Sequence, residues 1–111
     1  MKLKFNIFFL LLIFFSNISI CNAIDLNNGK ILFLNNCIVC HKNGGNVIIP
    51  EKNLKKEALE ENGMNNFDAI TYQVINGKNG MPAFGGRLEQ KEIEEIAQYV
   101  LKQSTLNFNE S

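Results

Sequence analysis

The spacing of apolar residues predicts helices in the region after residue 23. The clearest pattern lies near the end of the chain, where one helical face carries Ile93, Ile96, Ala97, Val100 and Leu101. A similar spacing predicts a helix from Asp25 to about Asn36. No segment of useful length alternates with the period of two that a half-buried strand shows. The pattern therefore predicts an all-α domain.

Two shorter helices are predicted between these two. The first covers 54–61 and should end near Gly63, because glycine readily takes the left-handed conformation that terminates a helix. The second covers 67–76, with an asparagine at 65 or 66 as its N-cap and Gly77 at its C-terminal end. The domain thus has about four short helices.

The loops and the charge of the chain limit its function. Glycine and proline mark 42–53 and 78–87 as long loops, so the helices build a small core that usually needs a covalent or metal staple. Residues 24–111 keep nine of the 11 basic residues and all 11 acidic ones, a formal charge of −2. This charge excludes a polybasic protein that binds nucleic acid. The length allows one domain and excludes a large enzyme with its own substrate domain.

Residues 1–23 have the pattern of a cleaved secretory signal peptide. Two lysines precede nine consecutive apolar residues, Ile7 to Phe15, and a short polar stretch ends on the small residue Ala23. The apolar run is much shorter than the ~20 residues that span a bilayer, which disfavours the alternative of an uncleaved membrane anchor. We expect cleavage after Ala23, export across one membrane, and a domain at 24–111 without stable membrane insertion.

The segment Cys37-Ile38-Val39-Cys40-His41 carries the most specific chemistry. Cys-x-x-Cys-His is the attachment signature of c-type haem. Two cysteines three positions apart face the same way on a helical turn, so each could bond to one haem vinyl group. His41 would then bind the iron from one side. We therefore expect one covalently bound haem c, attached at Cys37 and Cys40, and export agrees with this because such haem is attached after the chain crosses a membrane.

Three other uses of these residues are weaker hypotheses. A disulfide between Cys37 and Cys40 would close a very small loop. A thioredoxin-like redox pair usually stands in a βαβ unit, of which the pattern gives no sign. A structural zinc site needs four ligands, whereas residues 24–111 offer two cysteines and one histidine.

Met81 is the predicted second ligand of the iron, by elimination. His41 is the single histidine of the chain, so two histidine ligands are impossible. Met64 lies beside a predicted helix end, where packing is the better interpretation, whereas Met81 lies in a loop directly before Pro82. Proline extends the backbone before it, which helps to turn the Met81 side chain out of the loop. The alternatives are Met81 as core filler, an open iron and a lysine ligand.

Beyond this motif, longer segments resemble one family, the class I cytochromes c, and within it the cytochrome c6 proteins of cyanobacteria and algal plastids. The segments that carry the resemblance are 44–50, 54–56, 68–74, 76–88 and 99–101, of which 76–88 is the most specific. The resemblance covers essentially the whole of 24–111 and implies the class I fold, with helices wrapped around one haem. Gly80 departs from the family, which often has alanine before the methionine.

The resemblance implies a soluble, monomeric electron carrier and not an enzyme. It implies a place in the thylakoid lumen of a plastid or cyanobacterium, with the cytochrome b6f complex as donor and photosystem I as acceptor. A respiratory carrier to a terminal oxidase would use the same site, and a haem subunit could be fixed to a larger complex. A haem enzyme or sensor would need an open iron. Iron held by both His41 and Met81 has no easy site for oxygen, which favours one-electron transfer at the haem edge.

The sequence also predicts contacts around the site. Gly29 should let the first and last helices approach closely, with Phe33 packed on the last helix. A ligating histidine nearly always donates its other ring N–H. The predicted acceptor for His41 is a backbone carbonyl in the loop around Pro50, and the Pro50 carbonyl is the candidate because the fixed φ of proline can hold it in place.

The residues near Met81 are expected to tune the haem and to meet its partners. The amide of Gln73 or of Asn79 could hydrogen-bond near the Met81 sulfur or a haem propionate. Ala83 and Phe84 are candidates for a small apolar docking face at the haem edge. Charged candidates are Arg87, which would aid orientation, and two acidic clusters, one of Glu57, Glu60, Glu61 and Asp68 and one at 89–95. We expect the first cluster to meet a basic patch on the acceptor, with solvated helix faces as the alternative.

Overall fold

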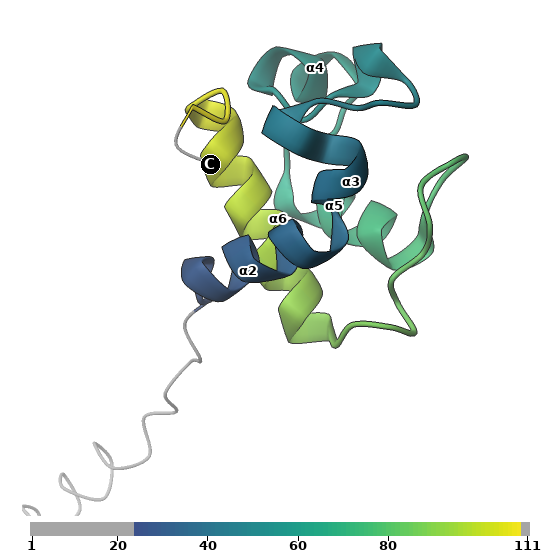
Figure 1. Ribbon diagram of the computed structural model, residues 1–111, viewed down its shortest axis with the longest axis vertical. Coiled ribbons are helices and arrows are strands. Elements are labelled where there is room, and N and C mark those ends of the chain that lie inside the picture. Colours follow the sequence, from purple (N-terminus) through teal and green to yellow (C-terminus); the bar gives the residue numbers. More distant parts are fainter. Residues whose placement is uncertain (1–23, 110–111) are drawn as a thin grey trace, which may run out of the picture.

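The computed structural model describes residues 24–109, and its regular elements there are helical (Figure 1). In chain order they are α2 (Leu26–Asn36), α3 (Ile38–His41), the 3₁₀ turns η1 (Lys42–Gly44) and η2 (Pro50–Lys52), α4 (Lys56–Glu61), α5 (Phe67–Asn76) and α6 (Gln90–Thr105). The described residues hold no strand beyond one isolated bridge between Lys78 and Met81. The all-α prediction is confirmed. The predicted signal peptide, 1–23, lies outside the described residues.

Side-chain caps place the helix ends close to their predicted positions. Asp25 Oδ1 accepts hydrogen bonds from two backbone N–H groups in the first turn of α2, at 3.0 and 3.2 Å. Asn66 Oδ1 accepts one from the first turn of α5 at 2.8 Å. Helix α4 begins two residues later than predicted, because Asn53 Oδ1 accepts the N–H of Lys55 at 3.0 Å and Lys55 stays extended.

Helices α2 and α6 cross and pack closely (Figure 1). Gly29 is buried at the crossing, where an added Cβ would collide with the backbone carbonyl of Glu95 and lie 3.1 Å from Cβ of Tyr99. One turn further along α2, the buried ring of Phe33 has its centroid 5.3 Å from that of Tyr99. Both predictions for this crossing, the close approach at Gly29 and the contact of Phe33 with the last helix, are confirmed.

Glu95 is a buried part of the same crossing, with 2% of its surface exposed. Its Oε2 accepts a hydrogen bond from Asn28 Nδ2 at 2.6 Å, and Lys91 Nζ lies 3.9 Å from its Oε1. A carboxylate in this position joins α2 to α6 and cannot meet a partner protein. The prediction of an acidic docking cluster at 89–95 is therefore wrong for Glu95.

The core lies where α2, α5 and α6 meet. Its buried apolar residues are Leu32, Phe33, Ile70, Val74, Phe84, Ile93, Ile96, Ala97, Tyr99, Val100 and Phe108. Within residues 24–109, no helix has both the length and the apolar character that crossing a bilayer requires. The core continues on one side into a cavity, which α3, α4 and the 78–87 loop complete.

Candidate functional site

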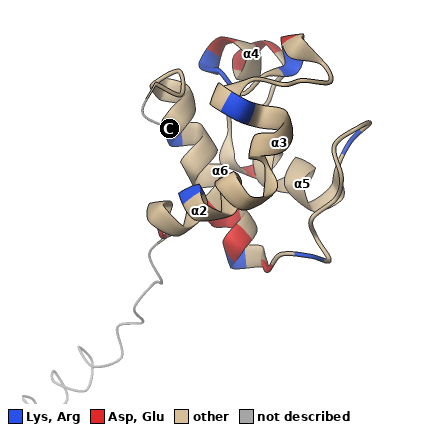
Figure 2. Cartoon of the chain, in the orientation of Figure 1, with Lys and Arg blue, Asp and Glu red and all other residues tan. Residues whose placement is uncertain are grey.

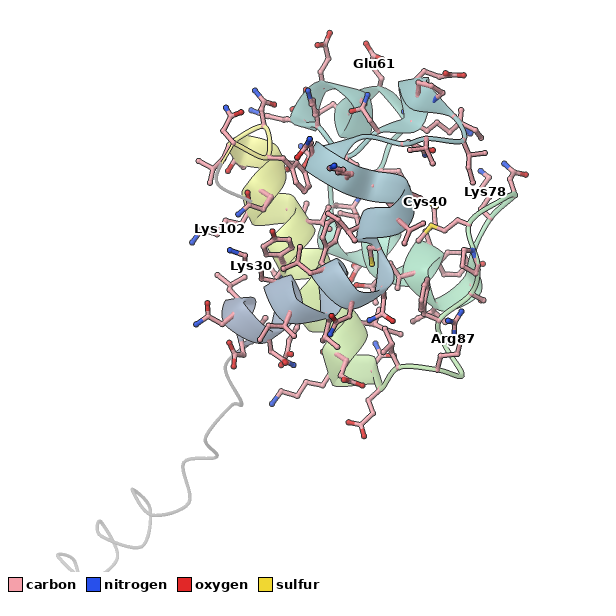
Figure 3. All side chains as sticks on the ribbon, in the orientation of Figure 1. Lys30, Cys40, Glu61, Lys78, Arg87 and Lys102 are labelled. Carbon is pink, nitrogen blue, oxygen red and sulfur yellow. The ribbon has the colours of Figure 1, made fainter. Side chains whose placement is uncertain are left out.

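The cavity has a volume of about 390 Å³. It is lined by every residue that the sequence assigned to haem binding: Cys37, Cys40, His41 and Met81. Most of its other lining residues are apolar and include Ile48, Ile49, Leu54, Leu59, Ile70, Val74, Ile96 and Val100. Figure 3 shows Cys40 on the side of α3 that faces the loop carrying Lys78. An apolar wall with a few convergent polar groups and sulfurs suits a flat, largely apolar cofactor.

The two cysteines lie on either side of the first turn of α3, a helix that the sequence pattern did not separate from α2. Cys37 ends α2, and its carbonyl accepts the N–H groups of Cys40 at 3.2 Å and His41 at 2.9 Å. Both thiols are free and half-buried, so the structure gives no support to a disulfide. Burial, and to a lesser extent the neighbouring Cys40, raises the pKa of Cys37 to about 11.

The surroundings of the two thiols disfavour both a thioredoxin-like redox pair and a zinc site. A redox-active cysteine has a lowered pKa, because the thiolate is the nucleophile. Residues 24–109 also contain no group of three or more His, Cys, Asp and Glu side chains that could hold a metal ion. The thioredoxin-like and zinc hypotheses therefore find no support, and the residues fit a c-type haem.

The ring of His41 is held by the backbone carbonyl of Gly45, which lies 2.8 Å from Nδ1. A carbonyl can only accept a hydrogen bond, so Nδ1 carries the ring proton and Nε2 keeps its lone pair for a metal. The acceptor is a backbone carbonyl of the 42–53 loop, as predicted, but it is not that of Pro50, which accepts from Asn53 Nδ2 at 3.0 Å. The cause is the turn after α3, where Asn43 has φ 55° and the next residue φ 74°, which brings Gly45 back toward His41.

Met81 is positioned by a tight loop after α5. Its backbone N–H and carbonyl exchange hydrogen bonds with Lys78, at 3.0 and 3.1 Å. Gly77 begins the loop with φ 69°, and a Cβ there would lie 2.6 Å from the Met81 carbonyl. Gln73 Nε2 donates to Met81 Sδ at 3.6 Å, which confirms the expected amide contact for Gln73. Asn79 is exposed in the same loop.

Comparisons with known proteins agree with this site. A family model described as cytochrome c oxidase, cbb3-type, subunit III matches residues 25–100. Cytochrome c6 of Petalonia fascia is 62% identical over 81 residues, which are 73% of this chain and 95% of that relative. Cytochrome c6 of Pyropia yezoensis is 54% identical over 106 residues, covering 94% of this chain and 96% of that relative. The solved structure of cytochrome c6 from the diatom Phaeodactylum tricornutum is 47% identical, with a TM-score of 0.73, and covers 75% of this chain and 98% of that one.

This chain belongs to the cytochrome c6 family. It accordingly carries one covalently bound haem c and is an electron carrier, not an enzyme. The class I cytochrome c fold expected from the sequence is confirmed, and the haem is the staple that its small core needs. The family also excludes the haem-enzyme alternative.

Of the two residues predicted for an apolar docking face, Ala83 and Phe84, one is exposed and the other is buried. Phe84 is buried, with its N–H bonded to the Val74 carbonyl at 2.9 Å and the Arg87 guanidinium 4.7 Å from its ring centroid, so its assignment to a docking face is wrong. Ala83 is exposed, as a docking face requires.

Three exposed side chains beside the pocket form an apolar rim: Val39, Val47 and Ile48, which are 83%, 67% and 54% exposed. Val39 and Ile48 line the cavity, and the Val47 N–H donates to the Cys40 carbonyl at 3.0 Å, which holds the 46–49 segment against α3. The sequence did give a signal for this rim, since apolar residues in a polar, glycine-rich loop are unusual. The run Val47 to Ile49 is too short to count as a strand, and the sequence analysis assigned it no other role.

The first acidic cluster is exposed but mixed with lysines. Figure 2 shows both signs of charge on α4. Lys56 Nζ lies 3.9 Å from Glu60 Oε1, so the charge of Glu60 is partly balanced within the helix. Glu61 and Asp68 are also exposed, and no ion pair with a lysine is seen for either among residues 24–109. Their negative charges are therefore less balanced than that of Glu60.

Proposed function

We propose that this chain is a soluble one-electron carrier of the thylakoid lumen, which accepts electrons from the cytochrome b6f complex and delivers them to photosystem I. In this proposal Cys37 and Cys40 would form the thioether bonds to the haem, and His41 and Met81 would be the two protein ligands of its iron. The observation that carries it is the convergence of these four side chains on one apolar cavity in a chain of the cytochrome c6 family.

The bound haem would supply one-electron chemistry at its iron, and the chain would control how that iron behaves. The Gly45 carbonyl keeps the proton of His41 on Nδ1, so that Nε2 is free for the metal. The amide of Gln73 donates to the Met81 sulfur, which lines the same cavity as His41. If His41 and Met81 both held the iron, no position on it would be left for oxygen, and the carrier would only gain and lose electrons.

The proposed location requires export of the precursor. We propose that 1–23 is the signal peptide and that the mature domain starts at Ile24, because a lysine-rich start, an apolar run and a small residue at Ala23 succeed one another. The mature domain would act as a monomer that meets both partners through the apolar rim around the haem. A charge of only −2 fits brief contacts with two different complexes.

The proposal is tested on the mature protein made in a host that attaches haem c. We expect a reduced spectrum that carbon monoxide leaves unchanged, the far-red band of methionine ligation in the oxidised protein, and fast reduction of flash-oxidised photosystem I. Met81→Ala should lose the far-red band and gain carbon monoxide binding, while Met64→Leu should change neither. Carbon monoxide binding by the unmodified protein would overturn the ligand assignment.

A respiratory carrier is the second candidate, because the matched family model takes its description from an oxidase subunit. The same protein preparation distinguishes the two. Electron delivery to a terminal oxidase at a rate equal to or above that to photosystem I would favour the respiratory function, since the haem site alone does not choose the acceptor.

A further inference from the structure

The chain folds back on itself immediately after α6. The N–H of Phe108 donates to the Gln103 carbonyl at 2.8 Å, and the N–H of Asn107 donates to the Ser104 carbonyl at 3.2 Å. These two bonds are the pair that ends a helix with a left-handed residue, and here Asn107 has φ 51°. Phe108 itself has φ 59°, an unfavourable backbone conformation for a residue with a large side chain. Packing around its ring must offset this cost.

The ring of Phe108 is buried and packs against both α2 and the turn after α3. Its centroid lies 6.1 Å from that of Phe33 on α2, at an interplanar angle of 37°. The ring also lies against Gly44, where an added Cβ would collide with it and lie 2.6 Å from its Cγ. The C-terminal segment therefore covers the turn that follows α3.

That turn determines where the hydrogen-bond acceptor of His41 lies. Gly44 has φ 74°, and its carbonyl accepts the Leu54 N–H at 2.7 Å, so the turn is fixed on the side of the 42–53 loop. The next carbonyl in the chain is that of Gly45, which accepts the proton of His41 Nδ1 at 2.8 Å. Phe108 packs directly against the residue before this acceptor.

We propose that Phe108 is a positioning residue for His41: by packing on Gly44 it holds the direction of the Gly45 carbonyl and thereby the strength of the hydrogen bond to Nδ1. This inference rests on the proposed function, in which His41 binds the haem iron. The hydrogen bond makes the imidazole a better electron donor to the metal. A stronger donor stabilises oxidised iron, so Phe108 lowers the reduction potential.

Phe108→Ala in the haem-loaded protein tests the proposal. Without the ring, water reaches Gly44 and the turn gains freedom, so exchange of the Nδ1 proton of His41, followed by NMR, should become about tenfold faster. The midpoint potential should rise, because the ligand donates less. Phe108→Leu keeps most of the apolar contact and should restore most of both properties, and it also provides the test should Phe108→Ala not take up haem.

Ile93→Ala is the matched control. Ile93 lies in α6 and is, like Phe108, a buried apolar residue, but it does not line the cavity. Its truncation should therefore lower the stability of the fold without touching the turn after α3. Ile93→Ala should leave the Nδ1 exchange and the potential unchanged. Equal changes in the Ile93 and Phe108 variants, or no change in the Phe108 variants, would overturn the proposal.

The same experiment separates this inference from the function on which it rests. If His41 is not an iron ligand, its ring protons in the unmodified protein will lack the large shifts that a haem imposes. If those shifts are present but unaffected by Phe108→Ala, only the positioning role fails.

Discussion

Gln73 donates a hydrogen bond from Nε2 to the sulfur of Met81 at 3.6 Å, and so joins α5 to the loop that follows it. The positive end of the amide withdraws electron density from the sulfur. An iron that receives less density from its ligand is easier to reduce, so this contact raises the reduction potential of a haem bound by Met81.

Replacing Gln73 with valine should therefore lower the midpoint potential. Loss of a hydrogen bond of about 1 kcal/mol corresponds to a few tens of millivolts for one electron. Redox titration of the haem-loaded protein measures the shift. Asn76→Val is the control, because Asn76 is an exposed amide at the end of α5 that does not line the cavity, and it should keep the original potential. Equal potentials for Gln73→Val and the unmodified protein would remove Gln73 from the determinants.

Gly29→Ala should destabilise the fold at the crossing of α2 and α6. The new methyl group would meet the Glu95 carbonyl, which is backbone and cannot move aside. We expect the free energy of unfolding to fall by about 1–3 kcal/mol, the usual cost of overpacking. Gly86→Ala serves as the control, because a Cβ there meets nothing within 4 Å. Denaturant unfolding followed by circular dichroism should show no loss for Gly86→Ala, and a similar loss in both variants would contradict the packing explanation.

Local signals explain why the helices and the haem-binding side chains could be predicted. A helix cap such as Asp25 bonds to residues within three positions, so it can be read from the local sequence. Attachment of haem c itself requires the spacing of Cys37, Cys40 and His41, so these residues can be recognised without any structure. The acceptor of His41 could not be predicted, because it depends on the left-handed conformation of Asn43, which the sequence permits but does not require.

Long-range packing explains the other wrong predictions. Glu95 looked like a surface acid because its neighbours along the chain are charged, and only the crossing of α2 buries it. Phe84 looked exposed in a glycine-rich loop, but its backbone bonds to α5 and turns its ring into the core. Phe108 gave no local signal at all, since its contacts with Phe33 and Gly44 span more than half of the chain.

Tyr99 predicts how stability depends on alkaline pH. Its hydroxyl is buried with no hydrogen-bond partner among residues 24–109, and burial raises its pKa above the ordinary value of 10. The folded chain thus holds the phenol proton more tightly than the unfolded chain. This contribution to stability is fully present below about pH 10 and is lost as the pH rises through the raised pKa.

The free energy of unfolding in urea titrations should therefore fall as the pH rises above about 10, and Tyr99→Phe should make that fall smaller. Tyr72→Phe is the control, because Tyr72 is exposed and its removal should leave the pH profile unchanged. A profile that Tyr99→Phe does not alter would show that other groups cause the alkaline loss.

The acids near the pocket should affect the rate of docking more than the strength of the complex. Glu61→Lys or Asp68→Lys should slow reduction of photosystem I by about twofold to threefold at low salt, because steering acts on association. At about 1 M salt, where charges are screened beyond ~3 Å, the difference should vanish. Glu94→Lys on α6 makes the same change in net charge and should have a smaller effect. An equal slowing by all three variants would point to net charge alone.

The apolar rim should act independently of salt. Val47 is 67% exposed beside the pocket, and its contact with a partner would bury an apolar surface. Val47→Thr keeps the shape of the side chain and adds a hydroxyl, which must lose its water when the partner docks. A lost apolar contact of about 1 kcal/mol should weaken the complex about fivefold at low and at high salt alike. Ile31→Thr is the matched control, since Ile31 is 56% exposed on α2 and is not part of the apolar rim. Flash-induced reduction of photosystem I, followed over a range of carrier concentrations, measures the affinity. If Ile31→Thr weakens the complex as much as Val47→Thr, the partner binds another face of the molecule.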